Sequence, residues 1–306
     1  YTPNSTVYDP NLKPQNTKSY ELGADLTFLN GLISLSYTYS RQNVKDQIFS
    51  VPLAASTGYG SLVTNGGSIH TNAHEVTLGI KPIDMKNFKW DMQFNFSKID
   101  NYVDKLAEGV NSIFLGGFTE PQVRAGIGYK FPVIYGVSYL RADDGQLLLD
   151  SRGLPQAGEE KVIGTVSPKF TLGFNTNFEI YKLRISAVLD WKNGGQMYAA
   201  TSGMLDYYGV SKKSGDYRNK ESFIIDGVQE VNGQYVKNTS KIYGSQTEAK
   251  ANNAASAQDY FTAMNDVSES MIAENSFIKL RELSLSYPVF EKSWLKVDAS
   301  LFARNI

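Results

Sequence analysis

The stretch KFTLGFNTNFEIYKLRISAVLDWKNGG, residues 169–195, decides the fold. Apolar residues stand at alternate positions in its first half, beginning with Phe170 and Leu172, and polar residues stand between them. The chain turns at Tyr181-Lys182, and a second alternating run follows. Because successive side chains of a β-strand point to opposite faces, this pattern predicts an antiparallel hairpin with one apolar and one polar face.

The same alternation recurs in pairs along the chain. It predicts eight strands of about ten residues each, near 19–28, 32–41, 73–82, 88–98, 169–180, 183–192, 276–287 and 295–306. In the seventh, Ile278 and Leu280 differ in parity from Leu283 and Leu285, which predicts a bulge near Arg281-Glu282. Connections within pairs are short. Those between pairs, 42–72, 99–168 and 193–275, are long and all lie at one edge of the sheet.

Composition limits the classes of protein that fit. The chain has 306 residues, a net charge of −1 and no cysteine, so it has no disulfide or thiolate site and no basic arm for nucleic acid. Its mean hydropathy is −0.30, and no window approaches the roughly 18 apolar residues that a membrane helix needs. Hydropathy alone would therefore class the chain as soluble, but this test does not detect β-barrels, whose strands are only half apolar.

Alternating strands fit both a soluble β-sandwich and a membrane barrel. Three features favour an all-β, antiparallel transmembrane β-barrel. Strands of about ten residues match a tilted crossing of a bilayer, short turns alternate with long loops, and aromatic residues stand near the ends of the apolar stripes. We therefore expect short periplasmic turns, long extracellular loops, and an apolar face turned toward lipid. A soluble sandwich remains the alternative.

In a barrel the polar face lines the lumen. The residues that we expect there include Glu21, Asp25, Asp91, Asn175, Asn177, Glu179, Arg184 and Asp190. Two roles stay open for them, a hydrated wall that grips a plug and direct contact with a substrate. No His or Ser-His arrangement accompanies these carboxylates, so the sequence predicts no catalysis.

The loop 193–275 carries candidate substrate-binding residues. Rings stack on sugar faces while polar groups bind hydroxyls, and the candidates that combine these features are Tyr207, Tyr208, Tyr217, Arg218 and Asp226. The alternative is that these residues pack within the loop or against a partner. Residues 245–264 have the composition of a short helix within this loop.

Metal and cofactor sites are not expected. His70 and His74 are the only histidines, and on a strand they would stand roughly 13 Å apart, too far for one ion. Asp143, Asp144 and Asp150 lack the spacing of a calcium-binding EF-hand loop, and Asp144-Gly145 predicts a hairpin turn. A calcium ion bound in this loop is the alternative.

Four segments resemble the SusC/RagA family of TonB-dependent outer-membrane transporters. They are LKPQNTKSYELGADLTFLNGLISLSYTYSRQNVKDQI at 12–48, GTVSPKFTLGFNTNFEIYK at 164–182, NSFIKLRELSLSYP at 275–288 and ARNI at 303–306. Gln15 stands where the family pattern has Glu. The segments occur in the family's order and span nearly the whole chain, which makes the resemblance specific.

The resemblance implies a barrel of about 22 strands around an N-terminal plug, of which this chain would be a segment cut at both ends and lacking the plug. It also implies import of an oligosaccharide or a peptide, a SusD-like surface lipoprotein as partner, and energy delivered by the TonB-ExbB-ExbD system through the plug. Two alternatives remain: a structural or adhesive outer-membrane barrel, and a passive porin.

Overall fold

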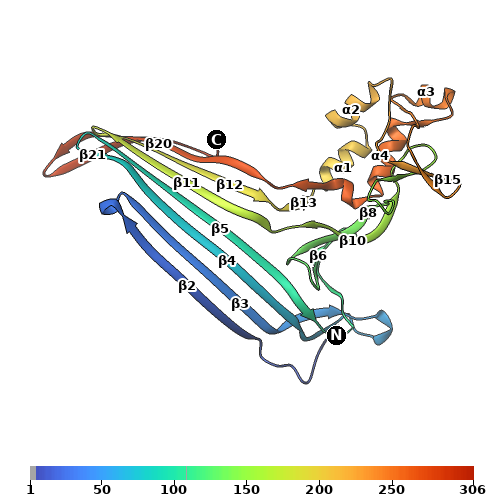
Figure 1. The fold of residues 1–306 in the computed structure, drawn as a ribbon, viewed down its shortest axis with the longest axis horizontal. Coiled ribbons are helices and arrows are strands. Elements are labelled where there is room, and N and C mark those ends of the chain that lie inside the picture. Colours follow the sequence, from blue (N-terminus) through green and yellow to red (C-terminus); the bar gives the residue numbers. More distant parts are fainter. Residues whose placement is uncertain (1–4, 108) are drawn as a thin grey trace.

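The computed structural model describes residues 5–107 and 109–306. Its main sheet is antiparallel and keeps chain order, with a short strand, β1 (Thr6–Tyr8), pairing in parallel with β4. The other strands are β2 (Asn16–Phe28), β3 (Ile33–Pro52), β4 (Ser61–Met85), β5 (Phe88–Leu106), β11 (Pro168–Ile180), β12 (Leu183–Gly194), β20 (Phe277–Lys292) and β21 (Leu295–Arg304). Figure 1 shows these strands side by side, with the tight turns at one end and the longer connections at the other.

Tight turns close each hairpin at one end of the sheet. Leu29–Gly31 forms the short 3₁₀ turn η1, in which Asn30 has a left-handed backbone with φ of 54°. Tyr181 takes the same conformation between β11 and β12, also with φ of 54°, and its N–H donates to the carbonyl of Asn87. Tight reversals need such conformations, and the turn at Tyr181-Lys182 lies where the sequence predicted it.

Three of the strands are much longer than expected. β3, β4 and β5 contain 20, 25 and 19 residues, whereas a tilted crossing needs about 9–11. The expected long loop at 42–72 is therefore wrong, because most of it continues the β3–β4 ladder and only the segment with η2 (Ala55–Thr57) lies between the two strands. Alternation weakens in this stretch, so periodicity could not predict these extensions of the strands. Pairing with the neighbouring strands maintains them.

The bulge in β20 lies where the alternation changes parity. Val188 of β12 faces Glu282, but the next residue, Leu189, faces Leu280, so Arg281 has no partner opposite it. One extra residue restores Leu283 and Leu285 to the face occupied by Ile278 and Leu280. The bulge therefore keeps the apolar stripe of β20 on one side of the sheet.

The two longest connections fold together into what we call the loop module, residues 109–167 and 195–276. Its N-terminal part holds the sheet β10-β8-β7-β6, built from β6 (Ser112–Gly117), β7 (Gln122–Gly126), β8 (Val133–Tyr139) and β10 (Ala157–Thr165). The short strands of the module are β9 (Leu148–Leu149), β13 (Gln196–Tyr198), β14 (Ser222–Phe223), β15 (Val228–Val231), β16 (Gln234–Lys237), β17 (Ile242–Tyr243), β18 (Ala255–Ser256) and β19 (Ile272–Glu274). They form separate small sheets, β13-β19, β14-β17-β18 and β16-β15-β9.

The helices of the described residues belong to this module, apart from the 3₁₀ turns η1 and η2. They are α1 (Ala200–Tyr207), α2 (Lys212–Arg218), α3 (Gln246–Ala251), α4 (Ala257–Asn265) and the 3₁₀ turn η3 (Ser268–Met271). The segment expected to hold a short helix thus holds α3 and most of α4. Ser256 caps α4 in a reciprocal capping box with Asp259. Among the described residues, no helix is long and apolar enough to cross a membrane.

A hydrophobic core stabilises the loop module. Leu154, Ile242, Ala255, Tyr260 and Phe261 are buried together, so the core joins both connections although they are distant in the sequence. Two backbone N–H groups of β8 also donate to carboxylates from other segments of the module: Val137 donates to Glu120 at 2.6 Å and Tyr139 donates to Glu269 at 2.9 Å. The module is therefore a packed unit at the end of the sheet, not a set of separate loops.

Candidate functional site

The polar face of the main sheet is the first candidate surface. Strand register places the eight predicted lumen residues on this single face, in rows that cross the sheet. One row contains Asp25, Ser36, Thr77, Asn95, Gly173 and Asp190. Amides, hydroxyls and charges of both signs thus form a continuous hydrophilic surface across six strands.

A hollow of about 310 Å³ lies on this face near the tight turns. Asp91 and Asn177, which face each other across β5 and β11, line it together with Lys81 and Gln93. Gly79 leaves the space open, and a side chain there would collide with the hydroxyl of Ser34. The structure thus brings two of the predicted lumen residues to one depression.

The opposite face is apolar along the same rows. Trp90 and Phe178 stack with ring centroids 5.1 Å apart toward the tight turns. Toward the loop module, Phe170 contacts both Phe96 at 5.6 Å and Trp191 at 5.0 Å. The space between these aromatic pairs is filled by aliphatic and Phe side chains, so the face presents an apolar band with rings at both borders.

The one polar side chain in the middle of this band is satisfied. Thr176 is 9% exposed, and its hydroxyl accepts a hydrogen bond of 2.9 Å from the indole N–H of Trp90. A hydrogen-bonded pair costs little on an apolar face, whereas an unpaired polar group would be expensive there.

Of the five candidate residues in the loop, Tyr217 lies against the module core. Its ring stacks on Tyr260 with an interplanar angle of 5° and meets Phe223 edge-on at 4.8 Å. The ammonium of Lys220 sits 4.3 Å above the same ring. These contacts give Tyr217 a packing role in this structure.

The other four candidates lie nearer the surface. Tyr208 is 68% exposed and meets the half-buried Tyr207 edge-on at 5.1 Å. Arg218 is exposed, and its guanidinium donates to the carbonyl of Gly209 at 2.8 Å. Asp226 is exposed on the segment before β15. Tyr207 and Tyr208 are therefore the only two of the five whose rings are in contact.

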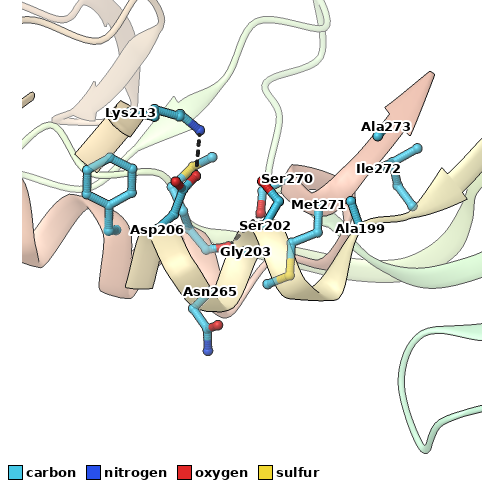
Figure 2. Close-up of a pocket in the computed structure, with 12 residues that line it drawn as sticks. Ala199, Ser202, Gly203, Asp206, Lys213, Asn265, Ser270, Met271, Ile272 and Ala273 are labelled. Atoms are coloured by element: carbon cyan, nitrogen blue, oxygen red, sulfur yellow. Dashed lines mark hydrogen bonds and ion pairs between the residues drawn. The ribbon is translucent and has the colours of Figure 1, made fainter. Parts of the chain in front are cut away.

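A cavity of about 130 Å³ lies between α1, α2, α4, η3 and β19. Figure 2 shows Asp206 and Lys213 at one end and Ile272 and Ala273 at the other. The ammonium of Lys213 lies 3.0 Å from Asp206, whose other oxygen accepts from Ser211 at 2.5 Å. None of the five predicted residues lines this cavity. No sequence signal identified it, because its walls come from segments that only tertiary folding brings together.

Burial raises the pKa of three tyrosines of the module, Tyr139, Tyr198 and Tyr260, and the first and last are the most buried of them. It raises the pKa of Tyr260 to about 12, with the nearby Tyr217 and Asp206 adding to the effect. It also raises the pKa of Tyr139, with further contributions from Tyr260 and Glu269. Both phenols therefore stay protonated at neutral pH and act as apolar, hydrogen-bonding groups.

The candidate metal residues have protein partners. Nδ1 of His70 lies 2.7 Å from Asp104, and Nδ1 of His74 lies 2.9 Å from the hydroxyl of Tyr37. Asp144 accepts hydrogen bonds from the backbone and side chain of Gln146, which lower its pKa, and Asp150 accepts from the N–H groups of Arg152 and Leu154. These carboxylates stabilise turns, and no group of three potential metal ligands occurs among the described residues.

A sheet with one apolar and one hydrophilic face, tight turns at one end and folded loops at the other, defines a wall segment of a membrane β-barrel. Residues 1–238 match the family described as TonB dependent receptor-like, beta-barrel. The chain therefore belongs to this family, whose members are outer-membrane transporters and not enzymes.

Individual relatives agree with this assignment. The chain is 27% identical over 212 residues to TonB-dependent receptor P3 of Formosa agariphila, covering 61% of this chain and 21% of that receptor. It is 31% identical over 107 residues to TonB-dependent receptor SusC of Bacteroides thetaiotaomicron, covering 35% of this chain and 11% of that receptor. The resemblance to the SusC/RagA type is thus confirmed, and the chain spans a minor part of these relatives.

The fold also agrees with a solved structure. The RagAB peptide transporter superposes with a TM-score of 0.65 at 18% identity, over 97% of this chain and 32% of that one. The predicted antiparallel barrel segment is therefore confirmed, and the soluble sandwich is excluded.

Proposed function

We propose that this chain forms part of the wall and the outer vestibule of a TonB-dependent importer for an oligosaccharide or a peptide. The observation that carries the proposal is the continuous polar face, which a purely structural membrane sheet would not need. Mixed charges and amides give a hydrated surface along which a polar solute can move. The hollow lined by Asp91 and Asn177 offers a contact point for a plug or a passing solute.

The loop module supports the second part of the proposal. It folds at the end of the sheet opposite the tight turns, where extracellular loops lie in outer-membrane barrels. Its exposed Tyr208, and Arg218 and Asp226 on the same module, offer ring stacking and polar contacts to a sugar or a peptide. A SusD-like surface lipoprotein would cover this module, and TonB with ExbB and ExbD would act through the plug.

An uptake assay in whole cells tests the proposal. Cells that express the full-length protein, with and without TonB, are given labelled oligosaccharide and labelled peptide libraries. We expect TonB-dependent depletion of one library, and mass spectrometry of the purified protein should recover a lipoprotein partner. Uptake that persists without TonB, together with conductance from the intact barrel, would support the passive porin instead. Loss of cell adhesion without any loss of uptake would support the adhesive barrel.

A further inference from the structure

The apolar face of the main sheet changes character toward the loop module. Over several rows it carries Leu, Ile and Phe, and the row with Ala24, Tyr37, Val76 and Phe96 ends this apolar band. In the rows beyond, cations and aromatic rings join polar groups and one acid on this face: Leu22, Tyr39, His74 and Lys98, then Tyr20, Arg41, Asn72 and Asp100, then Lys18, Asn43, His70 and Tyr102. The alternation of faces along the strands is unbroken across these rows, so the cations lie on the same outward face as the apolar band.

These side chains are connected to one another. The hydroxyl of Tyr37 lies 2.9 Å from Nδ1 of His74, and the ring of Tyr39 lies 5.1 Å from the His74 ring. Tyr39 and Arg41 both donate to the same amide oxygen of Asn72, at 3.2 and 3.5 Å. The tyrosines thus form a platform at the border of the apolar band, with Arg41 held just above it.

The charge of this surface is only partly balanced. Asp100 pairs with Lys130 at 2.5 Å and with Lys98 at 3.5 Å, and Asp104 pairs with His70. Within the described part of the chain, neither Lys18 nor Arg41 makes an ion pair, and both side chains are exposed. Lys98 shares Asp100 with the closer Lys130 and is 47% exposed, so its ammonium also stays accessible. An exposed excess of positive charge directly above an apolar, lipid-facing band complements an anionic headgroup.

We propose that Lys18, Arg41 and Lys98 bind a phosphorylated lipid headgroup of the outer leaflet, with the Tyr37–Tyr39 platform at the level where acyl chains meet headgroups. This rests on the orientation of the sheet and not on the transported substrate. Arg41 supplies a planar guanidinium suited to phosphate oxygens, and the two lysines supply point charges on either side. The lipid would anchor the barrel at a fixed depth.

Purified full-length protein in neutral detergent, titrated with diphosphorylated lipid A and followed by native mass spectrometry, tests this. The variant Lys18→Gln, Arg41→Gln, Lys98→Gln should bind on the order of 100-fold more weakly at low salt, with a smaller difference at high salt. The charge-preserving variant Lys18→Arg, Arg41→Lys, Lys98→Arg should bind like the parent. Phosphatidylcholine should bind weakly, and millimolar inorganic phosphate should not compete.

A matched control removes three cations from the other face: Lys89→Gln, Arg184→Gln and Lys192→Gln should leave lipid binding unchanged. Heat-dependent gel mobility establishes that each variant is folded. Unchanged lipid binding in the first variant, or equal losses in the first variant and the control, would overturn the proposal. A protein partner found bound to this face in place of lipid would also overturn the proposal.

Discussion

Arg281 donates two hydrogen bonds to one carboxylate oxygen of Asp190, from Nε at 3.1 Å and from Nη2 at 2.6 Å. The contact depends on the bulge, because Arg281 is the extra residue of β20 and its side chain turns onto the polar face beside Asp190. The same residue thus corrects the register of the apolar stripe and supplies a charged pair to the polar wall. Both partners are partly exposed, so the pair contributes little, about 0.2–1 kcal/mol.

Deleting Arg281 should be tolerated. The shortened strand alternates regularly, so every apolar residue of β20 keeps its face while only the ion pair is lost. Deleting Ser284 instead should prevent or weaken barrel formation, because the residues beyond it move to the wrong face. Heat-dependent gel mobility of the refolded protein distinguishes the two. Equal folding yields for both deletions would contradict the account of the bulge.

Ile185 and Arg184 are neighbours on opposite faces of β12. Ile185→Arg places a charge on the lipid-facing side and should destabilise the barrel by about 2–4 kcal/mol. Arg184→Ile removes a charge from the hydrated side and should cost far less. Denaturant unfolding in lipid vesicles gives both free energies of unfolding, and a reversed order would mean that the faces are exchanged.

The Trp90–Thr176 pair predicts an effect that depends on one hydroxyl. Thr176→Val keeps the shape of the side chain but leaves the indole N–H of Trp90 without its acceptor, which should cost about 1–3 kcal/mol. Thr176→Ser keeps the hydroxyl and serves as the control. Equal unfolding free energies for the Val and Ser variants would show that the hydrogen bond contributes nothing.

The loop module should lose stability at alkaline pH. Tyr260 has a folded pKa of about 12, above the value of about 10 expected for an unfolded tyrosine. Because the folded pKa is raised, this contribution is complete below about pH 10 and is lost as the pH rises through about 12. Tyrosinate absorbance measured against pH should show some tyrosines that titrate above about pH 10. The variant Tyr260→Phe should have one fewer of these tyrosines than the parent. Titration of every tyrosine near pH 10 would contradict the burial.

Much of the sheet could be predicted because alternation is a local property. The short turns, the bulge and the polarity of both faces follow from residue parity, as the hairpin of β11 and β12 illustrates. The extensions of β3, β4 and β5 could not be predicted, since Asn65, Gly66 and Gly67 carry no apolar alternation. Asn65 and Gly67 are held there by pairing with β3, and Gly67 also pairs with β5.

The loop module resisted prediction for a different reason. Its core joins Leu154 to Ile242 and Phe261, which are distant in the sequence and follow no periodic pattern. A tyrosine with amide and charged neighbours has the same local sequence whether it packs in a core or binds a ligand at the surface. Tyr217, which packs on Tyr260, and Tyr208, which is exposed, could therefore be distinguished only in three dimensions.

The central claim is that the polar face lines an aqueous lumen while the apolar face meets lipid. Because this chain has no cysteine, single cysteines at Asn175 and Phe174 can be labelled in outer-membrane vesicles with a small, membrane-impermeant thiol reagent. We predict rapid labelling of Asn175→Cys and protection of Phe174→Cys, with the same contrast at Asn177 and Phe178. Labelling of the Phe positions with protection of the Asn positions would contradict the claim.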